Sequence, residues 1–208
     1  MAQAKITRRQ IIKGAAAAGA ISALGLPSTA FADGGNGEDR RIRWDLVDVT
    51  PPDVSAGGDD TASAVDGSTL TLTGSGTFRP SSPRAVTGGG TWTTTDTTFP
   101  GSSGTYRVTE LISWRRAPGT LVGTAITNDH IGSLEDTRAG LAALRVKYSD
   151  GLDGVLFVSC TLKGTPPSVY EGINGSRNYV DFYTPAPNAF GKHANRTLFH
   201  AIGEKEED

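Results

Sequence analysis

The sequence predicts an all-β domain, built as a single antiparallel β-barrel or β-sandwich of about eight or nine strands with one short helix. Apolar and polar residues alternate with a period of two along several segments, which is typical of half-buried strands. The 27 Gly and 11 Pro residues interrupt these segments at short intervals, and helical patterns are scarce. Sequence patterns do not separate a barrel from a sandwich.

The first strands are expected at 42–47 and 69–78. In 42–47, Ile, Trp and Leu occupy alternate positions and charged residues lie between them. In 69–78, Leu70, Leu72 and Phe78 share one parity, and the threonines share the other. This alternation predicts one buried face and one hydroxyl-rich face.

Alternation continues over 105–115, where Glu110 interrupts it. Further extended runs are expected at 86–95, 121–127, 178–184 and 196–201. The clearest pairing joins 141–148 to 155–162. Two Asp-Gly steps lie between them, and Gly adopts positive φ at little cost, so the sequence predicts a hairpin here.

One short helix is expected after Ser133. Ser133-Leu-Glu-Asp136 has the spacing of a helix start, and Gly140 ends the stretch within about two turns.

The amino-terminal residues have the layout of an export signal. A basic segment with Arg8 and Arg9 precedes a weakly apolar stretch, and Ala30-Phe31-Ala32 places small residues where a peptidase requires them. Thr7–Lys13 resembles the bacterial twin-arginine motif. The resemblance implies the Tat translocase and signal peptidase as partners, with delivery to the periplasm, cell envelope or exterior.

Cleavage is expected after Ala32, which divides the chain into four parts. These are the signal peptide 1–32, a flexible linker 33–40, the β domain 41–202 and an acidic tail 203–208. The apolar stretch of the leader is shorter than the roughly 20 residues of a membrane-spanning helix, so no stable membrane anchor is expected.

Charge and cysteine content narrow the classes of function. Beyond residue 32 the chain has 16 Lys and Arg against 22 Asp and Glu, a formal net charge of −6. This balance argues against a nucleic-acid partner, because nucleic-acid binding relies on a basic surface. The single cysteine, Cys160, excludes an intramolecular disulfide, and its apolar surroundings favour a core residue over a nucleophile.

The densest group of ionisable residues contains Asp129, His130 and Glu135. A histidine beside carboxylates is suited to acid/base catalysis. The same acidic residues are also suited to cap turns and the start of a helix. No motif with metal-ligand spacing is present, so neither a metal nor a cofactor is expected.

The segment 164–183 reads as a long, irregular connection at its start, and long loops on rigid β scaffolds often carry binding sites. Its aromatic and charged residues could stack on and hydrogen-bond a sugar. Alternatively, the tyrosines cover one end of the core. The candidate ligand-binding residues are Tyr170, Glu171, Arg177, Tyr179, Asp181 and Tyr183.

Three short segments resemble those of uncharacterised exported β-rich bacterial proteins, and this resemblance implies no activity. They are Gly74–Phe78, Gly88–Trp92 and Ala194–His200. The leading hypothesis is an exported module that binds a small molecule, a glycan or a protein. The alternative is an exported barrel enzyme, a hydrolase, isomerase or cyclase. Convergence of the acid/base cluster and the 164–183 segment on one pocket would favour the enzyme. A third class, a surface-assembly protein, would expose a large apolar patch or an unprotected strand edge.

Overall fold

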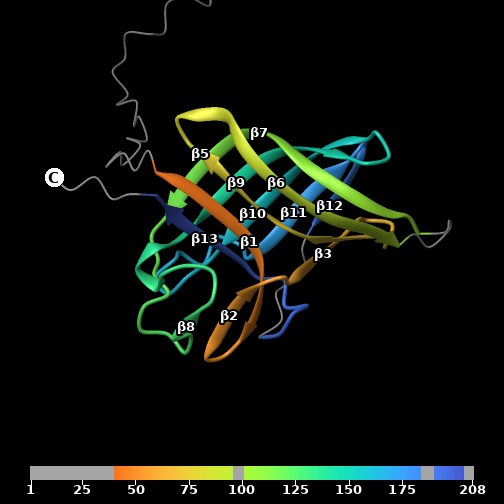
Figure 1. Ribbon diagram of the computed structural model, residues 1–208. Coiled ribbons are helices and arrows are strands. Elements are labelled where there is room, and N and C mark those ends of the chain that lie inside the picture. Colours follow the sequence, from red (N-terminus) through yellow and green to blue (C-terminus); the bar gives the residue numbers. More distant parts are fainter. Residues whose placement is uncertain (1–39, 96–100, 184–189, 204–208) are drawn as a thin grey trace, which may run out of the picture. The chain divides into compact units, whose positions relative to one another are not determined.

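The computed structural model describes residues 40–95, 101–183 and 190–203, and the regular secondary structure of these ranges is almost entirely β-strand (Figure 1). The all-β prediction is confirmed. The predicted signal peptide, residues 33–39 of the predicted linker and residues 204–208 of the predicted tail lie outside the described residues. Arg40, the last residue of the predicted linker, forms an ion pair with Asp136 at 3.0 Å.

The described residues form thirteen strands, more than the eight or nine expected. The strands are β1 (Arg41–Thr50), β2 (Asp53–Ala56), β3 (Asp59–Ser63), β4 (Thr69–Thr73), β5 (Ser75–Arg79), β6 (Ser82–Thr95), β7 (Ser103–Ala117), β8 (Asn128–Asp129), β9 (Thr137–Tyr148), β10 (Asp153–Cys160), β11 (Gly172–Arg177), β12 (Val180–Tyr183) and β13 (Thr197–Ile202).

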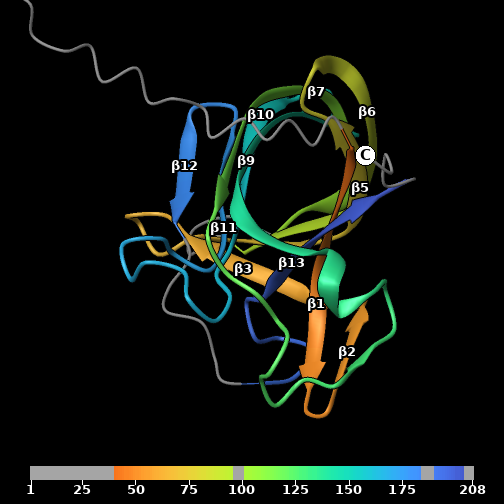
Figure 2. The ribbon, with the colours of Figure 1, turned by 90° about the vertical axis from the view of Figure 1, so that its left-hand side faces the viewer.

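The strand pairings close on themselves. From β9 they run through β10, β11, β12, β3, β4, β6 and β7 and return to β9, and every pairing in this circuit is antiparallel. In Figure 2 the ribbons of β9, β10, β7, β6 and β5 surround an opening, with β12 to its left. A second set of pairings closes as well. β13 pairs with both β9 and β1, β1 pairs with β5, and β5 pairs with β6 of the first circuit. β1 also pairs with β2, and β2 pairs in parallel with β8.

The predicted hairpin is present as β9 and β10. Leu144 lies opposite Leu156 in its register. The backbone N–H of Tyr148 donates to the carbonyl of Leu152 at 2.8 Å across the turn. Gly151 has a φ of +93° in that turn, which is the conformation that the Asp-Gly step predicts. The expected interruption at Glu110 is also present, because the β7–β9 register shifts between Val108 and Glu110.

The core is one cluster that contains buried residues of the eight-strand circuit and of β1, β5 and β13. Leu70, Leu72 and Trp92 are buried there together with Leu144 and Leu156. At one end, Trp92 packs edge-to-face against Tyr148 with ring centroids 5.8 Å apart, and the Arg177 guanidinium lies 4.2 Å from the Trp92 centroid. Cys160 is buried, as expected of a core residue.

Two local predictions were wrong. Residues 121–127 form an irregular loop rather than a strand, although Ile126 is buried. The expected helix is only the three-residue 3₁₀ helix η2 (Leu134–Asp136). The Ser133 side chain makes no cap hydrogen bond to it, because the hydroxyl donates to Glu135 instead. β9 starts directly afterwards at Thr137, so Gly140 lies within a strand.

Candidate functional site

A pocket of about 300 Å³ lies beside β1 and β13, under the connection 118–136 that leads from β7 to β9. Val47 and Val49 of β1 form part of it, and their parity places them on the same face of that strand as Asp45. Ten of the sixteen described lining residues are apolar. The lining comprises Val47, Val49, Pro51, Val54, Leu121, Thr124, Ala125, Ile126, Thr161, Leu162, Lys163, Glu171, Phe190, Arg196, Thr197 and Leu198.

Glu171 supplies the carboxylate of this lining, and it is buried. Thr161 donates to Oε2 from its backbone N–H at 2.5 Å and from its hydroxyl at 2.7 Å. The Thr197 backbone N–H donates to Oε1 at 2.8 Å. Burial raises the pKa of Glu171, and the hydrogen bonds from Thr197 and Thr161 offset only part of that effect. Because protein donors occupy both oxygens, Glu171 primarily joins Thr161, directly after β10, to Thr197 of β13.

Two cationic side chains, Lys163 and Arg196, complete the charged part of the described lining. The Lys163 ammonium donates to the Gly123 carbonyl at 3.2 Å. Within the described ranges, the Arg196 guanidinium donates no hydrogen bond to another residue. Arg196 is half-buried, and a guanidinium carries five N–H donors.

Asp60 of β3 lies close to this charged group without lining the pocket. Its side chain is fully buried, and neither carboxyl oxygen has a hydrogen-bond partner among the described residues. Burial raises the pKa of Asp60 to about 8. Glu171 and Asp59 raise it further, and the positive charge of Arg196 opposes the shift.

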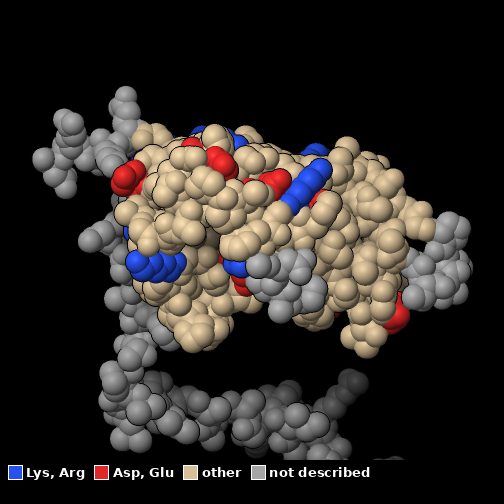
Figure 3. Space-filling view, turned by 90° about the horizontal axis from the view of Figure 1, so that it is seen from below, with Lys and Arg blue, Asp and Glu red and all other residues tan. Residues whose placement is uncertain are grey.

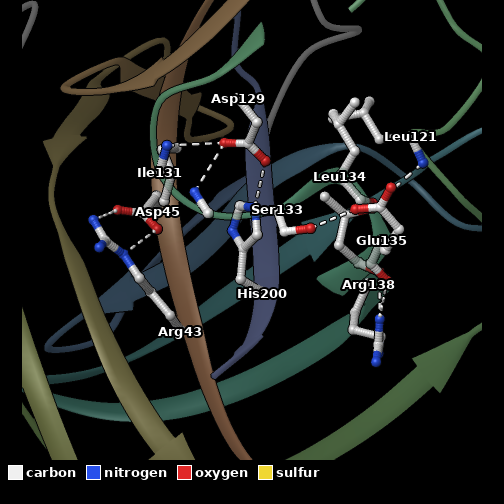
Figure 4. Close-up of polar contacts among 12 residues, drawn as sticks. Arg43, Asp45, Leu121, Asp129, Ile131, Ser133, Leu134, Glu135, Arg138 and His200 are labelled. Atoms are coloured by element: carbon white, nitrogen blue, oxygen red, sulfur yellow. Dashed lines mark hydrogen bonds and ion pairs between the residues drawn. The ribbon is translucent and has the colours of Figure 1, made fainter. Parts of the chain in front are cut away.

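The structure separates the three residues of the predicted acid/base cluster. Asp129 is buried and faces His200 of β13 (Figure 4). His130 is exposed and pairs with Asp53 at 2.8 Å. Glu135 accepts a hydrogen bond from the Ser133 hydroxyl. None of the three lines the pocket.

Asp129 and His200 form a buried pair that the sequence did not indicate. His200 Nε2 and Asp129 Oδ2 are 2.7 Å apart, and the two side chains are 1% and 2% exposed. The backbone N–H groups of Ile131 and Gly132 donate to Oδ1 at 2.9 and 3.1 Å. This contact fastens the connection 118–136 to β13. A Cβ on Gly132 would come within 2.7 Å of the imidazole, so the contact requires a glycine at this position.

A second buried carboxylate, Asp45, belongs to β1, the strand that pairs with β13 (Figure 4). Arg43 donates two hydrogen bonds to it, both at 2.8 Å. Arg43 and His200 are direct partners in the β1–β13 register. His200 Nδ1 is buried and has no hydrogen-bond partner among the described residues. None of these three side chains lines the pocket.

The candidate residues of 164–183 are also dispersed. They lie around the hairpin of β11 and β12, which replaces part of the expected irregular connection. Tyr179 and Tyr183 are exposed, Tyr170 is half-buried and Asp181 is exposed. Arg177 pairs with Asp150 at the end of the core near Trp92. Of this set, only Glu171 lines the pocket.

The view from below shows acidic and basic side chains scattered over that face among uncharged residues, without a single-sign patch (Figure 3). In the described part of the chain, no three His, Cys, Asp or Glu side chains gather as metal ligands. The helical residues of those same ranges form no segment long and apolar enough to cross a membrane.

Comparison with known proteins identifies the amino-terminal segment. Residues 5–25, which include Arg8 and Arg9, match the family model of the TAT (twin-arginine translocation) pathway signal sequence. Neither the curated proteins nor the solved structures gave a significant match to the chain. The chain therefore carries a twin-arginine signal, and the protein is exported by the Tat pathway to the periplasm, the cell envelope or the exterior.

Proposed function

We propose that the exported domain is a binding module that holds a small, amphipathic, anionic molecule in the pocket beside β1 and β13. We interpret the closed circuit of eight strands as a β-barrel that acts as a rigid support for this pocket. The volume of about 300 Å³ falls at the lower end of the range of ligand pockets. The apolar walls favour a hydrophobic portion of the ligand.

The single observation that carries the preference for an anion is the Arg196 guanidinium. It lies in the pocket lining without a hydrogen-bonded partner among the described residues, whereas the Glu171 carboxylate is already occupied by Thr161 and Thr197. Lys163 adds a second positive charge to the lining. A carboxylate or sulfonate would therefore find a donor available, and a cation would not find an available acceptor in Glu171.

The enzyme hypothesis has less support. Asp129 and Glu135 are engaged by neighbouring side chains, and His130 is exposed and paired with Asp53. These three residues do not meet at a concave surface that could hold a substrate. A glycan or protein partner on the exposed Tyr179 and Tyr183 stays a prediction, to which the dispersal of the other candidate residues adds no support.

Two fluorescent probes test the proposal. N-phenyl-1-naphthylamine is apolar and uncharged, and 8-anilinonaphthalene-1-sulfonate is apolar and anionic. We expect Ala125→Phe, which fills the pocket from an exposed loop position, to weaken the binding of both probes by about tenfold or more. Val122→Phe, in the same loop but outside the lining, is the matched control and should bind both probes as the wild type does.

Arg196→Gln should weaken the binding of the sulfonate by about tenfold, because it removes a charge-assisted hydrogen bond, and should leave the binding of the uncharged probe unchanged. Arg84→Gln, at an exposed position of β6, is its control. Equal losses in Ala125→Phe and Val122→Phe, or sulfonate binding that does not depend on Arg196, would contradict the proposal.

A further inference from the structure

Asp60 is the least explained ionisable group in the described part of the molecule. Its side chain belongs to the inward-facing set of β3, with Ala62 two residues further along the strand, and Leu72 of β4 lies directly opposite it. The side chain is fully buried, and both carboxyl oxygens are without hydrogen bonds. A buried carboxylate without partners is strongly disfavoured relative to the neutral acid.

The contacts around Asp60 connect it to the pocket. The Thr61 backbone N–H donates to the Asn195 side chain at 2.8 Å, and that side chain donates to the Thr61 carbonyl at 3.3 Å, so the chain at Arg196 lies beside β3. Arg196 and Glu171 both line the pocket, and both act on the charge of Asp60. The other ionisable groups near it are Asp59 on its own strand and Tyr106 of β7, whose hydroxyl donates to the Thr73 carbonyl at 3.0 Å. Arg196 is therefore shared between the interior of the strand circuit and the pocket lining.

We propose that Asp60 couples the protonation of the buried interior to anion binding in the pocket, so that the pocket takes an anion while Asp60 is neutral and releases it when Asp60 ionises. This inference rests on the proposed function and assigns a regulator to the same site. Asp60 is a positioning residue, because it acts through Arg196 and does not line the pocket.

The sign of the coupling follows from the charges. With Asp60 neutral, Lys163 and Arg196 outweigh Glu171 by one positive charge. Ionisation of Asp60 cancels that excess and draws the Arg196 guanidinium toward the interior. An anion in the pocket makes the ionisation of Asp60 less favourable in turn, because the coupling between two sites is reciprocal. Since the pKa of Asp60 is raised to about 8, anion affinity should fall as the pH rises through that value.

The test compares the two probes between pH 6.5 and 9.5, a range in which the sulfonate stays anionic and N-phenyl-1-naphthylamine stays uncharged. We expect wild-type affinity for the sulfonate to fall roughly tenfold over this range, and affinity for the uncharged probe to stay constant. Asp60→Asn should bind the sulfonate equally well at both ends of the range. Asp153→Asn, at an exposed position of β10, should keep the wild-type pH dependence.

A direct titration of the wild-type protein covers the case in which Asp60→Asn does not fold. The ¹³C resonance of the Asp60 carboxyl should titrate far above the range of an ordinary aspartate, and the sulfonate should raise its pKa further. The coupling is overturned if sulfonate affinity is constant with pH, if Asp60→Asn keeps the wild-type pH dependence, or if the probe leaves the Asp60 titration unchanged. Failure of the uncharged probe to bind would overturn the proposed function itself, whereas its binding together with a pH-independent sulfonate affinity would overturn only the coupling.

Discussion

The Asp129 carboxylate holds one wall of the proposed pocket in place. It binds His200 of β13 on one side and the backbone N–H groups of Ile131 and Gly132 on the other. The connection 118–136 that it fastens supplies Leu121, Thr124, Ala125 and Ile126 to the lining. A single buried side chain thus determines where that loop lies.

We predict that Asp129→Asn lowers the free energy of unfolding by about 1–3 kcal/mol at pH 7, because the amide replaces a charged acceptor in a buried hydrogen-bond group. Asp53→Asn is a matched control. It removes the carboxylate of another Asp–His pair, but that pair is 45% and 59% exposed and should contribute little. Urea denaturation of both variants checks the difference, and equal midpoints would contradict the prediction.

Acid should weaken the same contact. Burial alone would raise the pKa of Asp129, but the hydrogen bonds from His200, Ile131 and Gly132 outweigh burial and lower it. A carboxyl whose pKa is lower in the folded state stabilises the protein above about pH 4, and this contribution is lost as the pH falls through the folded-state pKa. Wild-type stability should therefore fall more steeply in acid than that of Asp129→Asn.

The sequence identified only part of this chemistry. Asp129 was a candidate because it stands among other ionisable residues, but its partner His200 is 71 positions away and becomes adjacent only when β13 pairs with β9 and β1. Glu171 was a candidate because tyrosines are near it in the sequence. In the structure its carboxylate binds Thr161 and Thr197 instead. No sequence pattern indicated a role for Asp60 or Arg196, because the burial of a charged residue follows from tertiary packing.

At the scale of the strands, close backbone approach explains several glycines. β5 and β6 pair with Gly76 opposite Gly88. A Cβ on Gly88 would overlap the Ser75 carbonyl oxygen and the Gly76 Cα, and its φ is +114°. The two strands can lie this close only because neither carries a side chain at the point of contact.

We predict that Gly88→Ala lowers the free energy of unfolding by about 2–4 kcal/mol, because it combines an unfavourable φ with a steric overlap against backbone atoms. Gly151→Ala isolates the first effect, since Gly151 has a φ of +93° and nothing lies within 4 Å of its added Cβ. Its cost should be about 1–2 kcal/mol. Urea denaturation of the two variants tests this, and an equal loss of stability would show that the overlap is relieved without cost.

Elements with a strong period-two pattern were predictable, and short ones were not. β1, β4, β7, β9 and β10 all carry alternating or continuous apolar residues that bury one face. β3 reads Asp-Asp-Thr-Ala-Ser and β11 reads Gly-Ile-Asn-Gly-Ser-Arg, so neither has an apolar alternation to detect. They form strands because neighbouring strands offer them backbone partners. By contrast, residues 121–127 contain apolar residues but form no strand, and Leu121, Ala125 and Ile126 line the pocket.

At the scale of the whole domain, β13 and β1 connect the circuit of eight strands to the pocket, and β1 reaches that circuit through β5 and β6. β9 belongs to the circuit and also pairs with β13, and β13 carries Leu198 into the pocket lining and His200 into the contact with Asp129. The pocket is thus supported from one side by the strand circuit and from the other by the connection 118–136. The twin-arginine motif predicted export and the charge balance predicted a non-basic domain, but strand patterns alone did not predict this topology.

Methyl NMR with sodium decanoate tests the central claim most directly, because decanoate is an apolar chain with a carboxylate and the pocket is lined by Val47, Val54, Leu121, Leu162 and Leu198. We predict saturable shifts at these methyl groups, with Leu144 and Leu156 inside the strand circuit unaffected, and loss of the shifts in Ala125→Phe. Shifts that are absent, that are spread over the exposed surface, or that persist unchanged in Ala125→Phe would contradict the assignment of this pocket as the binding site.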